Sequence, residues 1–318
     1  MWKAFGKNWF LFSLALCFLV GFSQASALQP ILRQTGLRDG LVFLVMWAMG
    51  VTLPAGQIKR SITQPRPSML AIGLNMIAVP LLCLPCVYLL PRDLFGGLFV
   101  TAIVPCTLAS ASVWTRKAGG DDSISMMTTV VTNLGCVLVV PLAIWLVLAK
   151  QVQVNPMDQV NKLTLLVAFP LILSQMMRLG GLARWADHNK GRIGVAGQFG
   201  ILVMVFFGSI ASGTMNGAAS NQDQNGFSMI ALMIFCAVSI HCVTLFLGIS
   251  ISRWLGMNSS RQIAIGLSGS QKTLMVGLQI AIDCGVSVIP MITYHLGQLL
   301  IDTIVADRWR RGSSKKAV

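Results

Sequence analysis

Glutamate is absent from this chain of 318 residues, and charged residues of any kind are scarce. All ten acidic residues are aspartates, and charged residues make up 11% of the sequence, whereas hydrophobic residues make up 55%. Soluble proteins carry about 25% charged residues. A soluble core cannot bury this much apolar surface, so the composition argues against a soluble enzyme, a nucleic-acid-binding protein and a disordered regulator. It predicts a polytopic membrane protein embedded in a lipid bilayer.

Two other compositional signals carry no separate function. The net charge of +14 does not indicate nucleic acid, because the positive residues lie between apolar runs, where membrane topology explains them. Cys83 and Cys86 form a C-x-x-C pair without polar neighbours, so we expect buried structural thiols rather than a redox or metal site. The sequence shows no nucleophile–base pair, metal-ligand cluster or phosphate loop. We therefore expect no enzyme activity and no organic cofactor.

Ten apolar runs are long enough to cross the roughly 30 Å hydrocarbon core of a bilayer as helices. Their connections are short, so we expect an all-α protein without a soluble domain. The expected spans are 9–28, 39–57, 68–90, 95–115, 123–149, 162–180, 193–213, 227–251, 262–282 and 286–306.

The first run has two interpretations. A basic start, an apolar stretch and the sequence Ala25-Ser26-Ala27 are typical of a cleaved signal peptide. Cleavage would leave nine spans in the same orientation. We favour a retained first helix, because the family resemblance described below includes this segment.

Lysine and arginine are distributed asymmetrically about the spans. With the N-terminus inside, 18 of the 24 lie at inner ends and one, Lys272, lies within a span. Positive residues collect on the cytoplasmic side, which predicts a protein of the cytoplasmic membrane with both termini in the cytoplasm. The five at outer ends are Arg33, Arg38, Arg92, Lys150 and Lys162.

The ten spans divide into five and five. We expect a first five-helix repeat over 1–150, a linker over 151–161, a second repeat over 162–306 and a basic cytoplasmic tail over 307–318. An odd number of helices in each half gives the halves opposite orientations. This is the arrangement of the inverted repeats found in many secondary transporters.

The fourth span of each half contains residues that disfavour a uniform helix. Span 95–115 holds Pro105, followed by small and hydroxyl residues, and span 262–282 has glycines and polar residues at its centre. Backbone groups freed at that depth need partners inside the protein. The pair of breaks predicts an ion or substrate site at mid-membrane, although a proline kink or close glycine packing would explain either break alone. The polar residues of the second break are Ser268, Ser270, Gln271, Lys272 and Thr273.

Two segments resemble a known family. Residues 104–142 read VPCTLASASVWTRKAGGDDSISMMTTVVTNLGCVLVVPL, and residues 266–277 read GLSGSQKTLMVG. They resemble the bile acid:sodium symporter superfamily, most closely its divergent SBF-like branch, and the likeness extends from about Asn8 to Val305. The resemblance implies a core of helices 3–5 and 8–10, a panel of helices 1, 2, 6 and 7, and crossing helices 4 and 9. It also implies sodium-coupled uptake of organic anions by alternating access.

The resemblance places candidate site residues in helices 3, 4 and 5. The family's helix-3 glutamine, which lies five residues before a proline, falls on Asn75 before Pro80. Its helix-4 sodium ligand falls on Ser112, and its helix-5 ligands fall on Ser125 and Thr129. Ser125 and Thr129 lie one turn apart on a shared helix face.

Helix 9 departs from the family pattern. The family's Gln-Asn-Ser falls on 271–273, so Lys272 stands in the place of the asparagine, and Leu267 stands where the family has a glutamate. A lysine about 4 Å from a sodium ion would repel it by roughly 4 kcal/mol at an effective dielectric constant near 20. We therefore leave the coupling ion open between Na⁺ and H⁺. Lys272 could be a built-in cation, a substrate counter-ion or a titrating group, or a structural tether to broken-helix carbonyls.

Other titratable residues have a functional and a structural interpretation. His241 and His295 lie about ten residues from the cytoplasmic ends of their spans, at the depth of Lys272. They are candidate proton-relay groups, although packing histidines would explain each one. Asp302 is expected to be an interfacial carboxylate near the cytoplasmic end of its span. Asp121 and Asp122 are expected to cap the helix that follows them.

The function we expect is a secondary transporter that moves a small organic anion across the membrane by alternating access. One alternative is a non-transporting membrane regulator with the same fold, which the missing glutamate favours. A third interpretation is efflux of arsenite or another oxyanion, because the Pro105-Cys106-Thr107 sequence also resembles arsenite permeases of this superfamily. The expected partners are this small molecule and the lipid bilayer.

The expected topology makes a prediction for cysteine labelling from outside the cell. Single cysteines placed in 151–161 or 213–226 should react with a membrane-impermeant maleimide, because both segments lie at outer ends of spans. Cysteines in 183–192 or 310–318 should react only after the membrane is permeabilised. Labelling of 183–192 in intact cells would contradict the ten-span topology.

Overall fold

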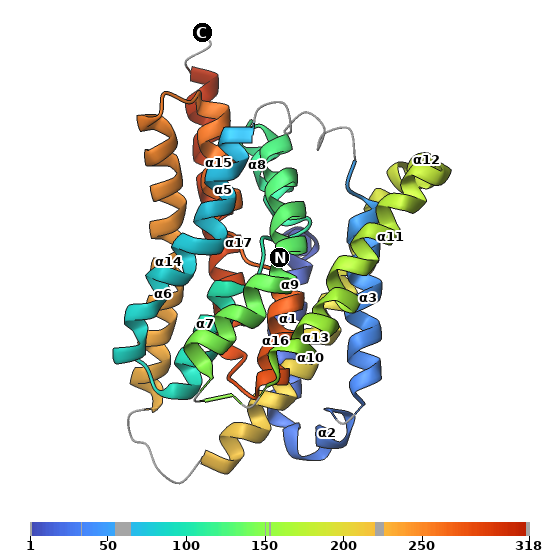
Figure 1. The fold of residues 1–318 in the computed structure, drawn as a ribbon, viewed down its shortest axis with the longest axis vertical. Helices are drawn as coiled ribbons and strands as arrows, with labels where there is room; N and C mark the ends of the chain where they lie inside the picture. Colours follow the sequence, from blue (N-terminus) through green and yellow to red (C-terminus); the bar gives the residue numbers. More distant parts are fainter. Residues whose placement is uncertain are drawn as a thin grey trace.

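The computed structural model describes residues 2–32, 34–54, 65–149, 151–152, 154–219 and 226–315, and every regular element in this part of the chain is a helix (Figure 1). The all-α expectation is therefore confirmed for these residues. The elements are α1 (Trp2–Ser23), α2 (Ala25–Leu32), α3 (Thr35–Val51), α5 (Pro65–Gly73), η1 (Leu74–Ala78), α6 (Val79–Cys83), η2 (Leu84–Tyr88), α7 (Arg92–Ile103), α8 (Ser110–Lys117), α9 (Asp122–Leu148), α10 (Pro156–Leu163), η3 (Thr164–Ala168), α11 (Phe169–Met177), η4 (Arg178–Leu182), α12 (Ala183–His188), α13 (Lys190–Ala219), α14 (Gly226–Trp254), α15 (Ser259–Ser270), α16 (Leu274–Cys284) and α17 (Ile289–Lys315).

Six helical stretches of the described residues are long and apolar enough to cross a membrane. A seventh is the pair formed by α1 and α2, which bends by 98° after Ser23. The other expected spans correspond to the 17-residue α3 and to the two interrupted pairs α7–α8 and α15–α16. The chain is thus a multi-pass membrane protein. The six continuous stretches are 65–88, 122–148, 156–188, 190–214, 226–254 and 289–311.

Two expected connections are shorter in the structure. The linker expected over 151–161 is partly helical, because Asn155 caps the helix that begins at Pro156 by accepting the N–H of Met157 (2.9 Å). The tail expected from residue 307 continues α17 as far as Lys315. The expectations for Arg33, 55–57, Lys150, 220–225 and 316–318 lie outside the described residues.

The helices pack as two groups, which we call the panel and the core. The panel consists of α1–α3 and α10–α13 with η3 and η4; α1 lies along α13, and α3 packs against α11 and α13. The core consists of α5–α9 with η1 and η2, and of α14–α17; α15 packs against α5, α9 and α14. This grouping agrees with the panel and core that the resemblance implies. The first expected span is part of the panel, where the Ser209 hydroxyl donates to the carbonyl of Cys17 (3.3 Å).

Panel and core contact each other mainly through α9 with α10 and η3, and through α16 with α13 and α3. These contacts lie toward the lower end in Figure 1, whereas α11 and α12 diverge from the core toward the end where the C-terminus lies. Asp121 caps α9 by accepting the N–H of Ser123 (3.2 Å), as expected. The two interrupted pairs lie side by side within the core and position the candidate site.

Candidate functional site at two crossing helix breaks

The fourth expected span is broken at Pro105. α7 ends at Ile103, Val104 is extended (φ −68°, ψ 157°), and α8 begins at Ser110. Proline has no N–H for the helical ladder and disfavours a helical conformation in the residue before it. The chain therefore leaves the helix over 104–109, and its carbonyls need other partners.

The ninth expected span is broken without a proline. α15 ends at Ser270, Gln271 and Thr273 are extended (ψ 141° and 126°), and α16 begins at Leu274. The backbone N–H of Thr273 donates to the carbonyl of Pro105 (2.9 Å). The interruptions expected from the sequence are both present, and they contact each other directly.

Side chains of the core satisfy the carbonyls of the second break. The Asn75 amide nitrogen donates to the Gln271 carbonyl (2.8 Å), and the Tyr294 hydroxyl donates to the Ser270 carbonyl (2.7 Å). Gln298 accepts the N–H of Lys272 (2.9 Å) and donates to its carbonyl (3.0 Å). The extended segment is therefore hydrogen-bonded as completely as a strand would be.

Side chains of α9 do the same for the first break. The Asn133 amide donates to the Cys106 carbonyl (2.9 Å), and the Thr129 hydroxyl donates to the Thr107 carbonyl (2.9 Å). The Thr132 hydroxyl accepts the Cys106 N–H (3.2 Å). Thr129 thus has a local role in holding the break.

Lys272 joins three helical elements at the crossing. Its ammonium is fully buried and donates to the backbone carbonyl of Asn75 (2.6 Å), to the Asn75 side-chain oxygen (3.3 Å) and to the carbonyl of Val104 (2.9 Å). A lysine ammonium has three N–H donors and no acceptor. Its donors are thus matched by three oxygens, two of which are backbone carbonyls at irregular positions.

The carbonyl of Asn75 is available to Lys272 because of Pro80. Residues 74–78 form a π-helical turn, in which the Val79 N–H bonds to the Leu74 carbonyl, five residues back. In the same register the Asn75 carbonyl would accept from residue 80, which is a proline and has no N–H. The sequence spacing Asn75 to Pro80 therefore leaves an acceptor inside the core, and Lys272 fills it.

Asp302 is not the interfacial carboxylate that we expected. It is fully buried, 3.1 Å from Nε2 of His241, and it accepts a short hydrogen bond from the Gln271 amide nitrogen. The Gln271 amide oxygen in turn accepts from the hydroxyls of Thr107 (3.1 Å) and Ser110 (2.9 Å). A buried carboxylate needs such partners because an isolated buried charge is very costly. Asp302, missed by the sequence analysis, links α17 to both breaks.

The predicted hydroxyls of these helices make separate local contacts. Ser125 pairs with Thr115 (2.7 Å), and Ser268 and Ser270 donate to carbonyls of their own helix. Ser112 is 5% exposed, and its hydroxyl has no hydrogen-bond partner among the described residues. His295 lies 2.8 Å from the Gln298 amide nitrogen and so supports the second break indirectly.

The residues at the crossing do not fit a resident sodium ion at the position that the resemblance implies. Leu267 is buried among apolar side chains, including Leu245 and Ile263, so no carboxylate is present there. The oxygens of Asn75 and Val104 are already bonded to the Lys272 ammonium.

The first break is partly exposed where α8 begins. Ala109 is exposed and Ser110 is half-buried, and the Ser110 hydroxyl is already bonded to Gln271. The N-terminus of α8 therefore combines a partly exposed start with the unpartnered Ser112 hydroxyl.

Comparison with known proteins supports the resemblance seen in the sequence. Residues 8–311 match the SBF-like CPA transporter family. The chain belongs to this family. It is a transporter of the bile acid:sodium symporter type rather than an enzyme.

Three relatives illustrate the similarity. A protein named "Putative symporter YfeH" from Escherichia coli is 24% identical over 224 residues, which cover 69% of this chain and 66% of the relative. "Probable sodium/metabolite cotransporter BASS4, chloroplastic" from Arabidopsis thaliana is 28% identical over 71% of this chain and 55% of its own length. "Uncharacterized sodium-dependent transporter YocS" from Bacillus subtilis is 24% identical over 86% of this chain and 83% of its own length. The chain thus spans a little over half of the Arabidopsis relative and about two thirds of the E. coli one.

The Pro80–Asn75–Lys272 arrangement predicts a thermodynamic coupling. Lys272→Met should lower the melting temperature, because it leaves two buried carbonyls without donors, at roughly 1–3 kcal/mol each. Pro80→Ala returns an N–H to the Asn75 carbonyl, so the double variant should be more stable than the sum of the single effects. The measurement is a double-mutant cycle on melting temperatures in one detergent.

Pro170 provides a matched control for this cycle. It follows the π-helical turn η3 as Pro80 follows η1, but it lies in the panel. The effects of Pro170→Ala and Lys272→Met on the melting temperature should therefore add. If the effects of Pro80→Ala and Lys272→Met also simply add, Pro80 does not free the Asn75 carbonyl for the lysine.

Proposed function

We propose that this protein is a secondary transporter that moves a small organic anion across the cytoplasmic membrane by alternating access. In this proposal the ten spans form two inverted five-helix repeats over 1–150 and 162–306, with 151–161 between them and both termini in the cytoplasm. The observation that carries the proposal is the direct contact between the two helix breaks, through Thr273 and Pro105. Each break lies in the fourth span of its repeat.

An anion is supported as substrate by the N-terminus of α8. Unpaired N–H groups give a helix N-terminus a partial positive charge, and transporter half-helices point these ends at anionic substrate groups. The Ser112 hydroxyl in the first turn of α8 is buried and unpartnered, so its O–H can donate to a ligand. A carboxylate or sulfonate is the group that this hydroxyl and the helix N-terminus would bind.

Lys272 is proposed to replace the coupling cation. Its ammonium holds the oxygens of Asn75 and Val104 together, as a bound cation would. Two relatives are named as sodium-dependent or sodium-coupled, but the lysine gives this chain an ammonium group of its own at the crossing. The proposed coupling ion is therefore H⁺, with His241 and Asp302 as the proton-binding pair and His295 as a second candidate.

Anion binding is tested with purified protein and a panel of small carboxylates and sulfonates, each paired with its neutral amide. Anions that bind should raise the melting temperature by mass action, and they should also enter proteoliposomes. Ser112→Ala should weaken binding roughly tenfold or more, because it removes a hydrogen bond to a charged group, and it should change stability little. Ser212, another buried serine without a partner, gives the control Ser212→Ala, which should leave binding unchanged. If no anion shifts the melting temperature or enters the liposomes, the protein is better described as a regulator.

Sodium independence is tested separately. Replacing sodium chloride by potassium chloride should leave the melting temperature of the natural protein unchanged. The variant Leu267→Glu with Lys272→Asn restores the family pattern and should gain about 2.7 kcal/mol when sodium is at 100 times its dissociation constant. The control is Leu267→Gln with Lys272→Asn, which lacks the carboxylate and should gain much less. Stabilisation of the natural protein by sodium would contradict the proposed role of Lys272.

A further inference from the structure

We propose that Arg38, Asp39, Lys162, Gln279 and Asp283 form a latch that closes panel and core against each other at one end and opens during transport. This inference rests on the proposed function, because only an alternating-access protein needs this contact to open. It concerns a group of residues separate from the helix breaks. By the expected topology this is the outer end.

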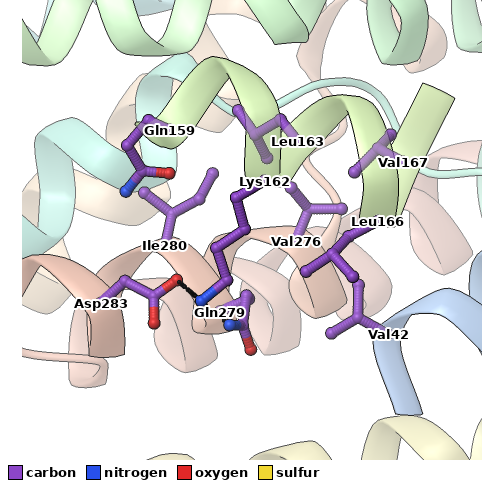
Figure 2. A pocket seen from close by; sticks show the side chains of 10 residues that line it. All are labelled: Val42, Gln159, Lys162, Leu163, Leu166, Val167, Val276, Gln279, Ile280 and Asp283. Carbon is purple, nitrogen blue, oxygen red and sulfur yellow. Dashed lines mark hydrogen bonds and ion pairs between the residues drawn. The ribbon is translucent and has the colours of Figure 1, made fainter. Parts of the chain in front are cut away.

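Three polar contacts of the latch join the panel to the core. Arg38 of α3 is 3.1 Å from Asp283 of α16. Lys162 of α10 is 2.8 Å from the same aspartate, a contact that Figure 2 shows. The Gln279 amide of α16 donates to Asp39 of α3 (2.9 Å). Lys162 also pairs with Asp39 (3.3 Å). Each of the two aspartates thus contacts at least one residue of the other group.

The charges of the latch balance, and two of them are well buried. Two cations face two carboxylates, and the side chains of Arg38 and Asp283 are 5% and 14% exposed. Removing one partner of a buried ion pair leaves the other charge uncompensated, which costs far more than the pair contributes. Loss of Asp283 would leave Arg38 and Lys162 together without that shared carboxylate, so the closed contact should weaken.

Apolar side chains are buried directly behind the latch. A small pocket lies between α3, α10, η3 and α16, and its wall includes Val42, Leu166, Val276 and Ile280 (Figure 2). Each of these four side chains is almost fully buried. Separation of panel and core at the latch would expose this apolar layer, so a side chain within it can report the opening.

Ion pairs at the opposite end have a different arrangement. Arg116 with Asp122 and Lys117 with Asp307 join elements of the core, and Arg178 with Asp187 joins elements of the panel. These three pairs can persist whether or not panel and core separate there. The structure thus shows a state that is held closed by charges at the end where α3 begins and α16 ends, and whose panel and core diverge toward the other end (Figure 1).

The test measures how fast a buried reporter at the latch reacts with a maleimide in detergent, with peptides identified by mass spectrometry. The reporter is Val276→Cys, since Val276 is 1% exposed and lines the pocket behind the latch. Asp283→Asn should raise its labelling rate roughly tenfold or more by shifting the population toward the open state. Lys162→Gln should act in the same direction. No substrate is needed, so the result is independent of whether the anion proposal holds.

Two controls separate opening of the latch from loss of structure. Asp122→Asn removes an ion pair within the core, and labelling of the reporter should stay slow in this variant. The natural Cys136 is fully buried in the core, and its labelling should stay slow in every variant. The proposal is wrong if Asp283→Asn leaves labelling of the Val276→Cys reporter slow, or if Asp122→Asn speeds this labelling equally. It is also wrong if Cys136 is labelled faster together with the reporter.

Discussion

The contact between the Lys272 ammonium and the carbonyls of Asn75 and Val104 is the interaction on which the centre of this protein depends. It ties η1, the first break and the second break together with one side chain. Both backbone acceptors trace to a proline: the Asn75 carbonyl lacks a helical partner because Pro80 has no N–H, and the Val104 carbonyl is free because the chain leaves the helix before Pro105. A side chain of the same size without a donor group would leave two buried carbonyls unpaired, which a membrane interior does not tolerate.

The same requirement explains why so many polar side chains surround the breaks. Asn133 and Thr129 of α9 serve the first break, and Tyr294 and Gln298 of α17 serve the second. Because these hydrogen bonds all lie within the core, the core keeps its broken helices fixed whatever the panel does. Movement during transport is therefore expected between core and panel, where α16 meets α3 and α13, rather than at the breaks themselves.

The sequence predicted those features that follow from backbone chemistry and depth. Pro105 and the glycines and polar residues near Gln271 indicated the breaks, and the position of Lys272 required an internal partner. The sequence could not show helix phase at the end of a span, so Asp302 was placed at the interface although its side chain points into the core. It likewise placed Ser125 and Thr129 on one face of α9 but could not show that they bond to different parts of span 4. Such pairings depend on how α8 packs against α9, and no local signal fixes that.

The balance of charge at the crossing bears on what can be moved with an anion. Lys272 and Asp302 carry opposite charges in the same buried network, joined through Gln271. An anion that enters at the N-terminus of α8 adds a negative charge to this network, and an uncompensated charge is costly where water is excluded. A metal cation has no place at the oxygens that the Lys272 ammonium already occupies. A proton needs no coordination shell, only an acceptor, and the 3.1 Å contact between His241 and Asp302 supplies one. The lysine that holds the breaks thus also makes a proton the simplest partner for the proposed anion.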